Sequence, residues 1–423
     1  MIFKAILVFA LLFFFMLLGA PMAVALGASN VITMVATTNL GITTIATACF
    51  SGLDSFPLLA VPFFILAGNL MKFGGLSQKI LDFADALVGH IKGALGMVTV
   101  VACMFFAALS GSSPATVSAI GSLTIPRMKD EGYDDAYATA LNAAAGTIGV
   151  IIPPSIPFVI YGVVANTSIA DMFKAGILPG ILIGIALCIV NYIAVSKNDY
   201  GKGHADKKFS FGKLGKTLKE SWLALMVPVI ILGGIYSGIF TPTESAVVGI
   251  VYTLLVGVFV YRELNPKTIY EAIRESVLVN GQTMFLVGFS MGFARFLTMS
   301  QIPASIAAQI SGIDSKIVVL LMINLFLLVV GCFIDNISSM LILTPIFLPI
   351  VQGYGMSSVQ FGIVMTVNLC IGFVTPPYGA NLFIASAISN VSIVKIAQKI
   401  LPMIFAMLIV LMMLTFIPQL IIF

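Results

Sequence analysis

Residues 146–155 read Gly-Thr-Ile-Gly-Val-Ile-Ile-Pro-Pro-Ser, and residues 372–381 read Gly-Phe-Val-Thr-Pro-Pro-Tyr-Gly-Ala-Asn. Each stretch places a Pro-Pro pair inside long apolar sequence. Proline lacks a backbone N–H and clashes with the preceding helical turn, so each pair must break a helix. The pairs Pro153-Pro154 and Pro376-Pro377 are 223 positions apart. The chain is therefore predicted to contain two related broken helices.

The same offset relates much longer segments. Residues 77–179 return as residues 300–402 almost without a gap. Matching positions include Ser77-Gln78 with Ser300-Gln301, Gly89 with Gly312, Pro126 with Pro349, Gly149 with Gly372, and Pro179 with Pro402. Such a fixed offset indicates an internal duplication. Paired broken helices in two halves of a membrane protein point to the binding site of a transporter. We therefore interpret the chain as a membrane carrier.

The composition excludes an ordinary soluble domain. Of 423 residues, 60% are hydrophobic and only 9% are charged. Apolar segments of about twenty residues recur, and each is long enough to cross about 30 Å of hydrocarbon. The first, residues 2–22, has no basic region beyond Lys4 and apolar sequence continues after Pro21, so it is predicted to be a membrane helix and not a signal peptide. The cysteines show no CxxC spacing, which favours inert thiols.

A basic segment divides the chain. Residues 196–221 contain seven lysines and are interpreted as a cytoplasmic linker, with no role in nucleic-acid binding. We expect one repeat in residues 1–195 and the other in residues 222–423. In the first repeat we expect spans at 3–22, 24–48 and 57–71, and a full span at 176–195. The remaining elements are expected as arms at 72–92 and 298–316, hairpins at 96–126 and 317–349, and broken helices at 136–165 and 356–389.

The orientation follows from counting crossings outward from the linker. On this interpretation each half of the chain crosses the membrane five times. Because the number is odd, the two repeats are inverted relative to each other. The reading places 17 of the 21 basic residues on the cytoplasmic side. Both termini are then predicted to be periplasmic. The fold class is an all-α polytopic membrane protein, with a re-entrant helical hairpin and a broken helix in each inverted repeat.

Polar residues at membrane depth predict the chemistry. The hairpins turn at Ser110–Thr116 and at Asp335–Ser339. Each Pro-Pro break frees carbonyl groups that cost several kcal/mol in hydrocarbon unless they are satisfied, and a sodium ion takes such oxygens as ligands. Facing helix N-termini favour an anion such as a carboxylate. We therefore predict two related cation sites beside one substrate position. The alternative is that these small residues only allow helices to pack closely.

Three charged residues have open interpretations. Asp335 is the only carboxylate placed at membrane depth, and it either contacts substrate or ion, caps a hairpin helix, or carries a proton. Glu244 follows Thr241-Pro242 and is expected to lie in the first turn of a helix. Arg295 occupies the repeat position of Lys72, and both are interpreted as anchors that reach the membrane interface.

Several of these motifs together resemble one family. They are Ser110–Thr116, Ile125–Met128, Asn142–Pro157, Phe240–Glu244 and Thr375–Asn381. The chain resembles the large membrane (M, DctM-like) subunit of tripartite ATP-independent periplasmic (TRAP) transporters over essentially its full length.

The resemblance implies a sodium-coupled importer of a carboxylate such as sialic acid or a C4-dicarboxylate, with Na⁺ as the coupling ion, in the bacterial inner membrane. It implies an elevator mechanism, in which a transport domain slides against a scaffold. It also implies a small four-helix subunit (Q), here as a separate chain, and a periplasmic substrate-binding protein (P). The alternative is a stand-alone sodium/dicarboxylate symporter or antiporter. We do not expect an enzyme, because neither a second carboxylate nor a histidine is placed to act with Asp335.

The resemblance also implies the site residues by position. The sodium ligands of one site are Ser112, Ser113, Asn142, Gly146 and Gly149, and those of the other are Asn336, Ser338, Gly372, Thr375 and Gly379. The substrate contacts are Ser110, Ser155 and Asp335.

Overall fold

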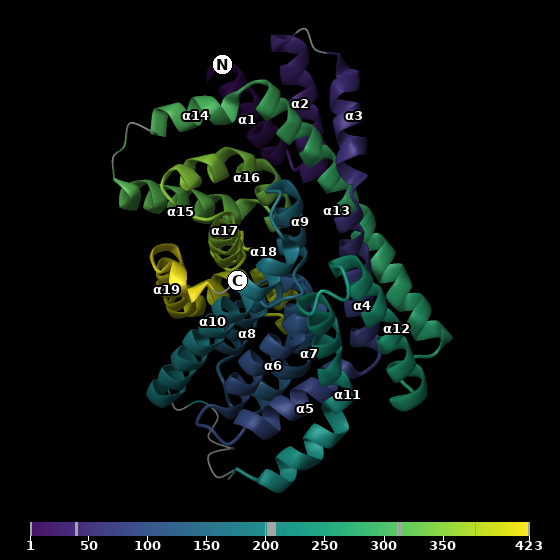
Figure 1. Cartoon of the computed structure of the whole chain (residues 1–423). Coiled ribbons are helices and arrows are strands. Elements are labelled where there is room, and N and C mark those ends of the chain that lie inside the picture. The colour runs from purple at the N-terminus through teal and green to yellow at the C-terminus, as the bar shows by residue number, and fades with distance from the viewer. Residues whose placement is uncertain are drawn as a thin grey trace.

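The computed structural model describes residues 2–38, 41–198, 200, 209–310, 313, 315–376 and 378–421. Within these residues the regular secondary structure is entirely helical (Figure 1). The first half contains α1 (Ile2–Leu17), α2 (Met22–Thr37), α3 (Ile42–Leu53), the 3₁₀ turn η1 (Phe56–Leu59), α4 (Ala60–Phe73), α5 (Leu76–Val88), α6 (Ala94–Ser110), α7 (Ser113–Asp130), α8 (Asp135–Gly146), the 3₁₀ turn η2 (Thr147–Val150), α9 (Ile156–Val164) and α10 (Ile169–Asn198).

The second half repeats this order. It contains α11 (Phe211–Tyr236), α12 (Pro242–Leu255), the π-helical turn η4 (Val256–Val260), α13 (Pro266–Met299), α14 (Ile302–Ile310), α15 (Lys316–Phe333), α16 (Asn336–Gly353), α17 (Ser358–Gly372), α18 (Ala380–Ser389), α19 (Ile393–Phe416) and the 3₁₀ turn η5 (Pro418–Leu420). At the 223-residue offset, α1 corresponds to α11 and α10 corresponds to α19. The long helix α13 corresponds to α3, η1 and α4 together, because Pro57 interrupts the helix only in the first half.

Eight of the described helices are long and apolar enough to cross a membrane. Their outer faces carry large apolar side chains, as lipid-facing helices do: Phe405 of α19 is 67% exposed and Phe285 of α13 is 55% exposed. The chain is therefore a polytopic α-helical membrane protein.

Two sequence-based boundaries are wrong. The expected span at 24–48 is two helices, because α2 ends at Thr37 and α3 begins at Ile42 after the extended residue Gly41. The expected linker at 196–221 is also shorter, since α10 continues to Asn198 and α11 begins at Phe211, where Ser210 caps it. Three of the linker's seven lysines, Lys202, Lys207 and Lys208, lie outside the described residues.

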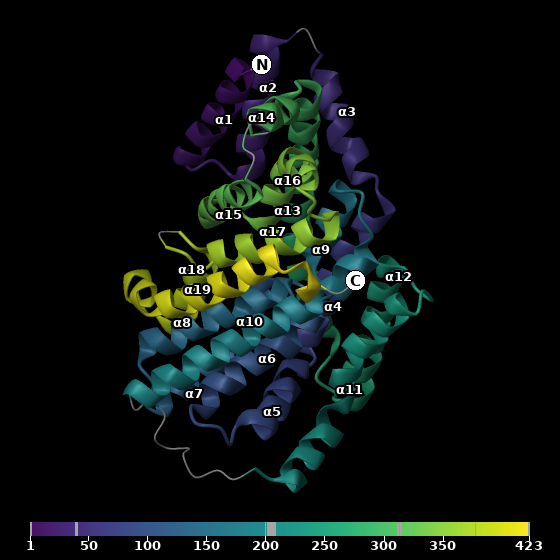
Figure 2. The same ribbon diagram turned by 60° about the vertical axis from the view of Figure 1, so that its left-hand side comes forward.

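The two halves pack against each other crosswise. The second hairpin helix of the first half, α7, packs against α18, which follows the break in the second half. In the corresponding way α16 packs against α9, and α10 packs against α19 (Figure 2). Helices α1, α2, α3 and α14 lie on one side of this central group, and α5, α11 and α12 lie on the other (Figures 1 and 2). The arrangement brings both hairpin turns and both breaks to the middle of the molecule.

Candidate functional site

The first hairpin turn is built by local capping. Helix α6 ends at Ser110, and Gly111 adopts a left-handed φ of 58° that reverses the chain. Ser112 then caps α7, its Oγ accepting a hydrogen bond from the Ala115 N–H at 3.4 Å. The Thr116 hydroxyl lies 2.9 Å from the Ser110 Oγ and donates to the Ser112 carbonyl at 2.9 Å. The turn is thus a compact set of hydroxyl and carbonyl oxygens.

The first break lies beside this turn. Helix α8 gives way to η2 at Thr147, and regular helix resumes only at Ile156. Ser155 caps α9 and donates from its Oγ to the Val150 carbonyl at 2.6 Å. The Ile156 N–H donates to the Gly111 carbonyl at 3.3 Å, which joins the break to the hairpin turn.

Glycine is required where the break approaches the hairpin. A Cβ on Gly149 would lie 2.3 Å from the Thr116 Oγ1 and 2.7 Å from the Ser112 carbonyl oxygen. A Cβ on Gly146 would lie 2.2 Å from the side chain of Val117. Helix α7 and the break can therefore approach so closely only because both positions lack a side chain.

The second hairpin and break meet in a related way. Asp335 caps α16, with its two oxygens accepting from the Ser338 hydroxyl at 2.6 Å and the Ser338 N–H at 3.1 Å. A Cβ on Gly372 would lie 2.3 Å from the backbone carbon of Gly331, so α15 and α17 touch there through their backbones. Asn336 donates from Nδ2 to the Cys370 Sγ at 3.3 Å. One residue of the second Pro-Pro pair, Pro377, lies outside the described part of the chain.

A pair of buried side chains joins the first hairpin turn to the second break. The buried Ser113 hydroxyl lies 2.8 Å from Nδ2 and 3.1 Å from Oδ1 of Asn381, the first-turn residue of α18. Asn381 also donates to the Ala143 carbonyl of α8 at 3.1 Å. Both hairpin turns and both breaks therefore form one connected cluster. Asn381 closes the Thr375–Asn381 motif, but sequence reasoning gave it no role.

The predicted sodium ligands differ in how they are used. With its amide oriented to satisfy both atoms, Asn142 donates to the Val117 carbonyl at 3.2 Å and accepts from the Gly121 N–H at 3.0 Å. The Thr375 hydroxyl donates to the Ile371 carbonyl at 2.7 Å. In contrast, the Asn336 Oδ1 is buried without a hydrogen-bond partner, as is the Asn368 Oδ1 of α17. A buried oxygen without a donor is costly in a protein interior and is available to a cation.

Four helix N-termini meet in this cluster. They are the first turns of α7, α9, α16 and α18. The partial positive charge of these N-termini favours an anion, while the carbonyl ends of α6, α8, α15 and α17 favour cations. The geometry can thus hold an anionic solute and cations close together. The predicted substrate residues Ser110 and Ser155 are buried here, and Asp335 is engaged as a helix cap.

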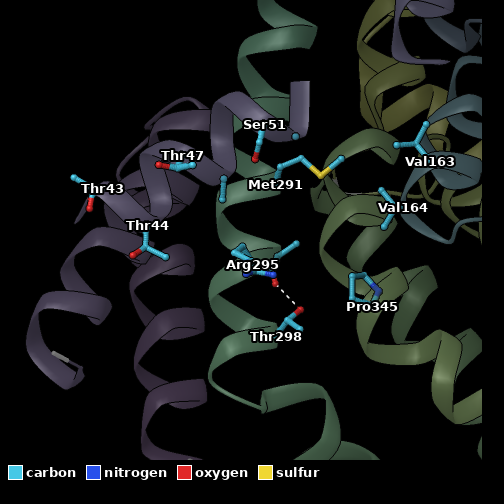
Figure 3. Close-up of a pocket in the computed structure, with 13 residues that line it drawn as sticks. Thr43, Thr44, Thr47, Ser51, Val163, Val164, Met291, Arg295, Thr298 and Pro345 are labelled. Atoms are coloured by element: carbon cyan, nitrogen blue, oxygen red, sulfur yellow. Dashed lines mark hydrogen bonds between the residues drawn. The ribbon is translucent and has the colours of Figure 1, made fainter. Parts of the chain in front are cut away.

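A hollow of about 760 Å³ lies apart from this cluster, between α3 and α13 on one side and α9 and α16 on the other (Figure 3). Its lining residues are Thr43, Thr44, Thr47, Ala48, Ser51, Gly52, Val163, Val164, Met291, Ala294, Arg295, Thr298 and Pro345. Within the described residues, no acidic side chain lies within 4.0 Å of the Arg295 guanidinium. The structure thus places Arg295 as an uncompensated cation among hydroxyl groups. Sequence reasoning had interpreted it only as an interface anchor.

The structure also describes Glu244 and the cysteines. The capping role of Glu244 is confirmed, because Thr241 and Glu244 form a reciprocal capping box at the start of α12. All five cysteines are free thiols, and Cys103, Cys332 and Cys370 are buried. No group of histidine, cysteine or acidic side chains suited to a metal ion occurs among the described residues.

Comparison with known proteins identifies relatives over nearly the whole chain. Residues 9–420 match the family described as "Tripartite ATP-independent periplasmic transporter, DctM component". The sequence is 45% identical over 405 residues to the isethionate TRAP transporter permease protein DctMQ of Oleidesulfovibrio alaskensis, covering 96% of this chain but 64% of the relative. It is 40% identical to the C4-dicarboxylate TRAP transporter large permease protein DctM of Pseudomonas aeruginosa, covering 93% and 92% of the two chains. It is 38% identical to the sialic acid TRAP transporter large permease protein SiaM of Vibrio cholerae, covering 95% and 93%.

A solved structure shares the fold. The crystal structure of the Alcanivorax borkumensis YdaH transporter, described as having an unusual topology, superposes with a TM-score of 0.64. The match covers 88% of this chain and 87% of that one at 13% sequence identity. At this identity the likeness concerns the fold alone.

Proposed function

This chain belongs to the DctM-component family of TRAP transporters and is a TRAP transporter large permease, and we propose that sodium drives it to import a small organic anion. The observation that carries the proposal is the single cluster formed by both hairpin turns and both helix breaks. Four helix N-termini meet there, which favours an anion, and the buried Asn336 Oδ1 and Asn368 Oδ1 have no hydrogen-bond donor. A cation beside an anion satisfies both sets of groups.

We propose the same two sets of sodium ligands that the family resemblance implies. In the first set, Ser112, Ser113, Asn142, Gly146 and Gly149 surround the contact of α7 with the first break. In the second set, Asn336 and Ser338 lie in the first turn of α16, Gly372 ends α17, and Thr375 and Gly379 lie in the break between α17 and α18. The Asn336 Oδ1 is the strongest single candidate because it is buried and unpaired. Sodium binding would rigidify the turns and so complete the substrate position beside Ser110, Ser155 and Asp335.

The substrate is an organic acid. The relatives are named for C4-dicarboxylate, sialic acid and isethionate, which share an oxyanion group on a small polar body. We expect a carboxylate, and the sulfonate of isethionate is the alternative. Arg295 supports an anionic substrate, because an uncompensated guanidinium beside hydroxyl groups attracts carboxylate and sulfonate alike.

Transport proceeds by an elevator movement in this proposal. The hairpins and broken helices, α6 to α10 with α15 to α19, form the moving unit, and the remaining long helices form the scaffold. The support is the crosswise packing of α7 on α18 and of α9 on α16, which makes the unit one body. The basic linker faces the cytoplasm of a bacterial cell and both termini face the periplasm.

The partners are a small four-helix membrane subunit and a periplasmic binding protein. A separate small subunit is expected here, although the Oleidesulfovibrio relative is named DctMQ and this chain spans about two thirds of its length.

Uptake into proteoliposomes tests the proposal. Vesicles would contain this chain with its small subunit, and would receive labelled succinate, sialic acid or isethionate with and without an inward sodium gradient and the binding protein. Uptake that needs both sodium and the binding protein is expected. Uptake that needs sodium alone would favour the stand-alone symporter, and uptake indifferent to sodium would refute the coupling.

A further inference from the structure

The residues that line the hollow beside Arg295 have counterparts in the other repeat. At the 223-residue offset, Arg295 corresponds to Lys72 and Gly52 corresponds to Glu275. Lys72 ends α4 and Glu275 lies in α13, and their side chains form an ion pair of 3.0 Å. The counterpart of the uncompensated arginine is therefore a lysine that already has an acid beside it.

The other residues of the hollow also carry fewer charges than their counterparts in the other repeat. In the hollow, α3 contributes Thr44, Ala48 and Ser51, which carry no charge. Their counterparts in α13 are Lys267, Glu271 and Arg274, so the related wall carries three cations and two acids, counting Lys72 and Glu275. Val163 and Pro345, which line the hollow from α9 and α16, correspond to Ser386 and Ser122. The wall of the hollow therefore carries one charged residue, Arg295, whereas the related wall carries five.

Lys72 is well placed to meet the solute. Gly68, one helical turn before it, touches the first hairpin turn, since a Cβ there would lie 3.3 Å from the Ser110 Cα. Of the three cations of this wall, Lys72 is the one that lies on α4, one helical turn beyond the residue that contacts the first hairpin turn. Without an acid beside it, the lysine would hold a departing organic anion.

We infer that the Lys72–Glu275 pair lines the inner mouth of the transport path, and that Glu275 competes with the organic anion for Lys72 and so speeds its release. The inference rests on the proposed function, because inverted repeats exchange their environments when the moving unit changes sides. The pair cannot alter the final accumulation, which the sodium and solute gradients set. It alters the affinity of the inner face.

The pair is not needed to hold its two helices together. Asn69 of α4 donates to the Ser276 hydroxyl of α13 at 2.8 Å, directly beside the ion pair. Both charged side chains are also partly exposed, at 38% for Lys72 and 45% for Glu275, and an exposed pair contributes little to stability. A neutral substitution at Glu275 is therefore expected to leave the fold intact.

Efflux from preloaded vesicles tests the inference. Vesicles with the chain and its small subunit in one orientation would be loaded with graded labelled succinate, sialic acid or isethionate, whichever the unaltered chain takes up. Glu275→Gln should lower the KM at the inner face about two- to fivefold and slow release, with the external KM unchanged. The double variant Lys72→Gln/Glu275→Gln should return the inner KM towards the unaltered value. Glu220→Gln, an exposed acid on α11, is the matched control and should change neither.

Three results separate the possibilities. An unchanged inner KM in Glu275→Gln would overturn the inference while leaving sodium-coupled uptake standing. A lowered unfolding temperature in Glu275→Gln, rescued by the charge swap Lys72→Glu/Glu275→Lys, with no change in KM, would assign the pair a purely structural role. Absence of sodium-driven uptake by the unaltered chain would instead reject the proposed function.

The position of the mouth is testable without transport. Ser122→Cys and Ser386→Cys should react with a membrane-impermeant maleimide from the linker side, above the labelling of the unaltered chain, and Val163→Cys from the opposite side. Labelling of Ser122→Cys and Ser386→Cys from the side opposite the linker would overturn the assignment.

Discussion

At the scale of single residues, the cluster separates groups that hold the fold from groups left for a ligand. Ser113 and Asn381 satisfy each other across the repeats, whereas the Asn336 Oδ1 has no donor. The same hydroxyl of Ser113 is assigned to sodium in the proposed function. Its two roles make different predictions, because a structural bond contributes stability whether or not sodium is present.

Ser113→Ala is expected to insert normally in the membrane but to need about ten- to a hundredfold more sodium for half-maximal uptake. The reason is that a lost contact to a charged group costs about 1.5–3 kcal/mol, and 1.4 kcal/mol corresponds to a factor of ten. Sodium activation curves in proteoliposomes measure this. A double-mutant cycle with Asn381→Ala supplies the control, read from the unfolding temperature without sodium. Unchanged sodium activation combined with strong coupling to Asn381 would leave Ser113 only its structural role.

Sequence reasoning at this scale located the polar segments but not their partners. The motifs around Ser110–Thr116 and Thr375–Asn381 stood out because polar and glycine residues interrupt apolar sequence. The bond between Ser113 and Asn381 joins positions 268 residues apart, and no local pattern predicts it. The surroundings of Arg295 were not predicted for a related reason: they depend on the absence of an acid at Gly52 on another helix.

At the scale of helices, close backbone approach is what builds the breaks. Gly372→Ala is expected to destabilise the protein by about 1–3 kcal/mol, because the new Cβ would meet backbone atoms of Gly331 that cannot move aside. Thermal unfolding in detergent measures the loss. Gly281→Ala in α13 is the matched control: a Cβ there meets nothing within 4 Å, so the helix should be unchanged or slightly more stable. Equal unfolding temperatures for the two variants would contradict the packing argument.

Helix boundaries were predictable wherever proline, glycine and a capping residue coincide. Helix α7 begins after Ser112 with Pro114 in its first turn, and α12 begins after Thr241 at Pro242. The division of the expected span at 24–48 was missed although the sequence carries a signal for it, because residues 37–41 read Thr-Thr-Asn-Leu-Gly. Such a polar stretch with asparagine and glycine favours a turn, even though apolar sequence flanks it on both sides.

At the scale of the whole molecule, the duplication predicts which helices correspond but not where the moving unit stands. The structure is asymmetric: α4 packs against α6, whereas its counterpart, the second part of α13, packs against α16. The two repeats thus make different contacts with the central helices. A constant offset in the sequence does not predict this difference. In the proposed elevator mechanism, the difference belongs to one position of the moving unit and not to the repeat itself.

A disulfide across the moving boundary should therefore arrest transport. Gly68→Cys with Ser110→Cys joins α4 of the proposed scaffold to the first hairpin, where a Cβ at residue 68 already lies 3.3 Å from the Ser110 Cα. Uptake should be lost on oxidation and return on reduction to the level of the weaker single variant. The control is Thr167→Cys with Ser358→Cys, whose native hydroxyls are hydrogen-bonded to each other across the two repeats inside the proposed moving unit. That disulfide should leave uptake unchanged, because both residues travel together. If it instead stopped transport while the first pair did not, the boundary of the moving unit would have to be redrawn between the repeats.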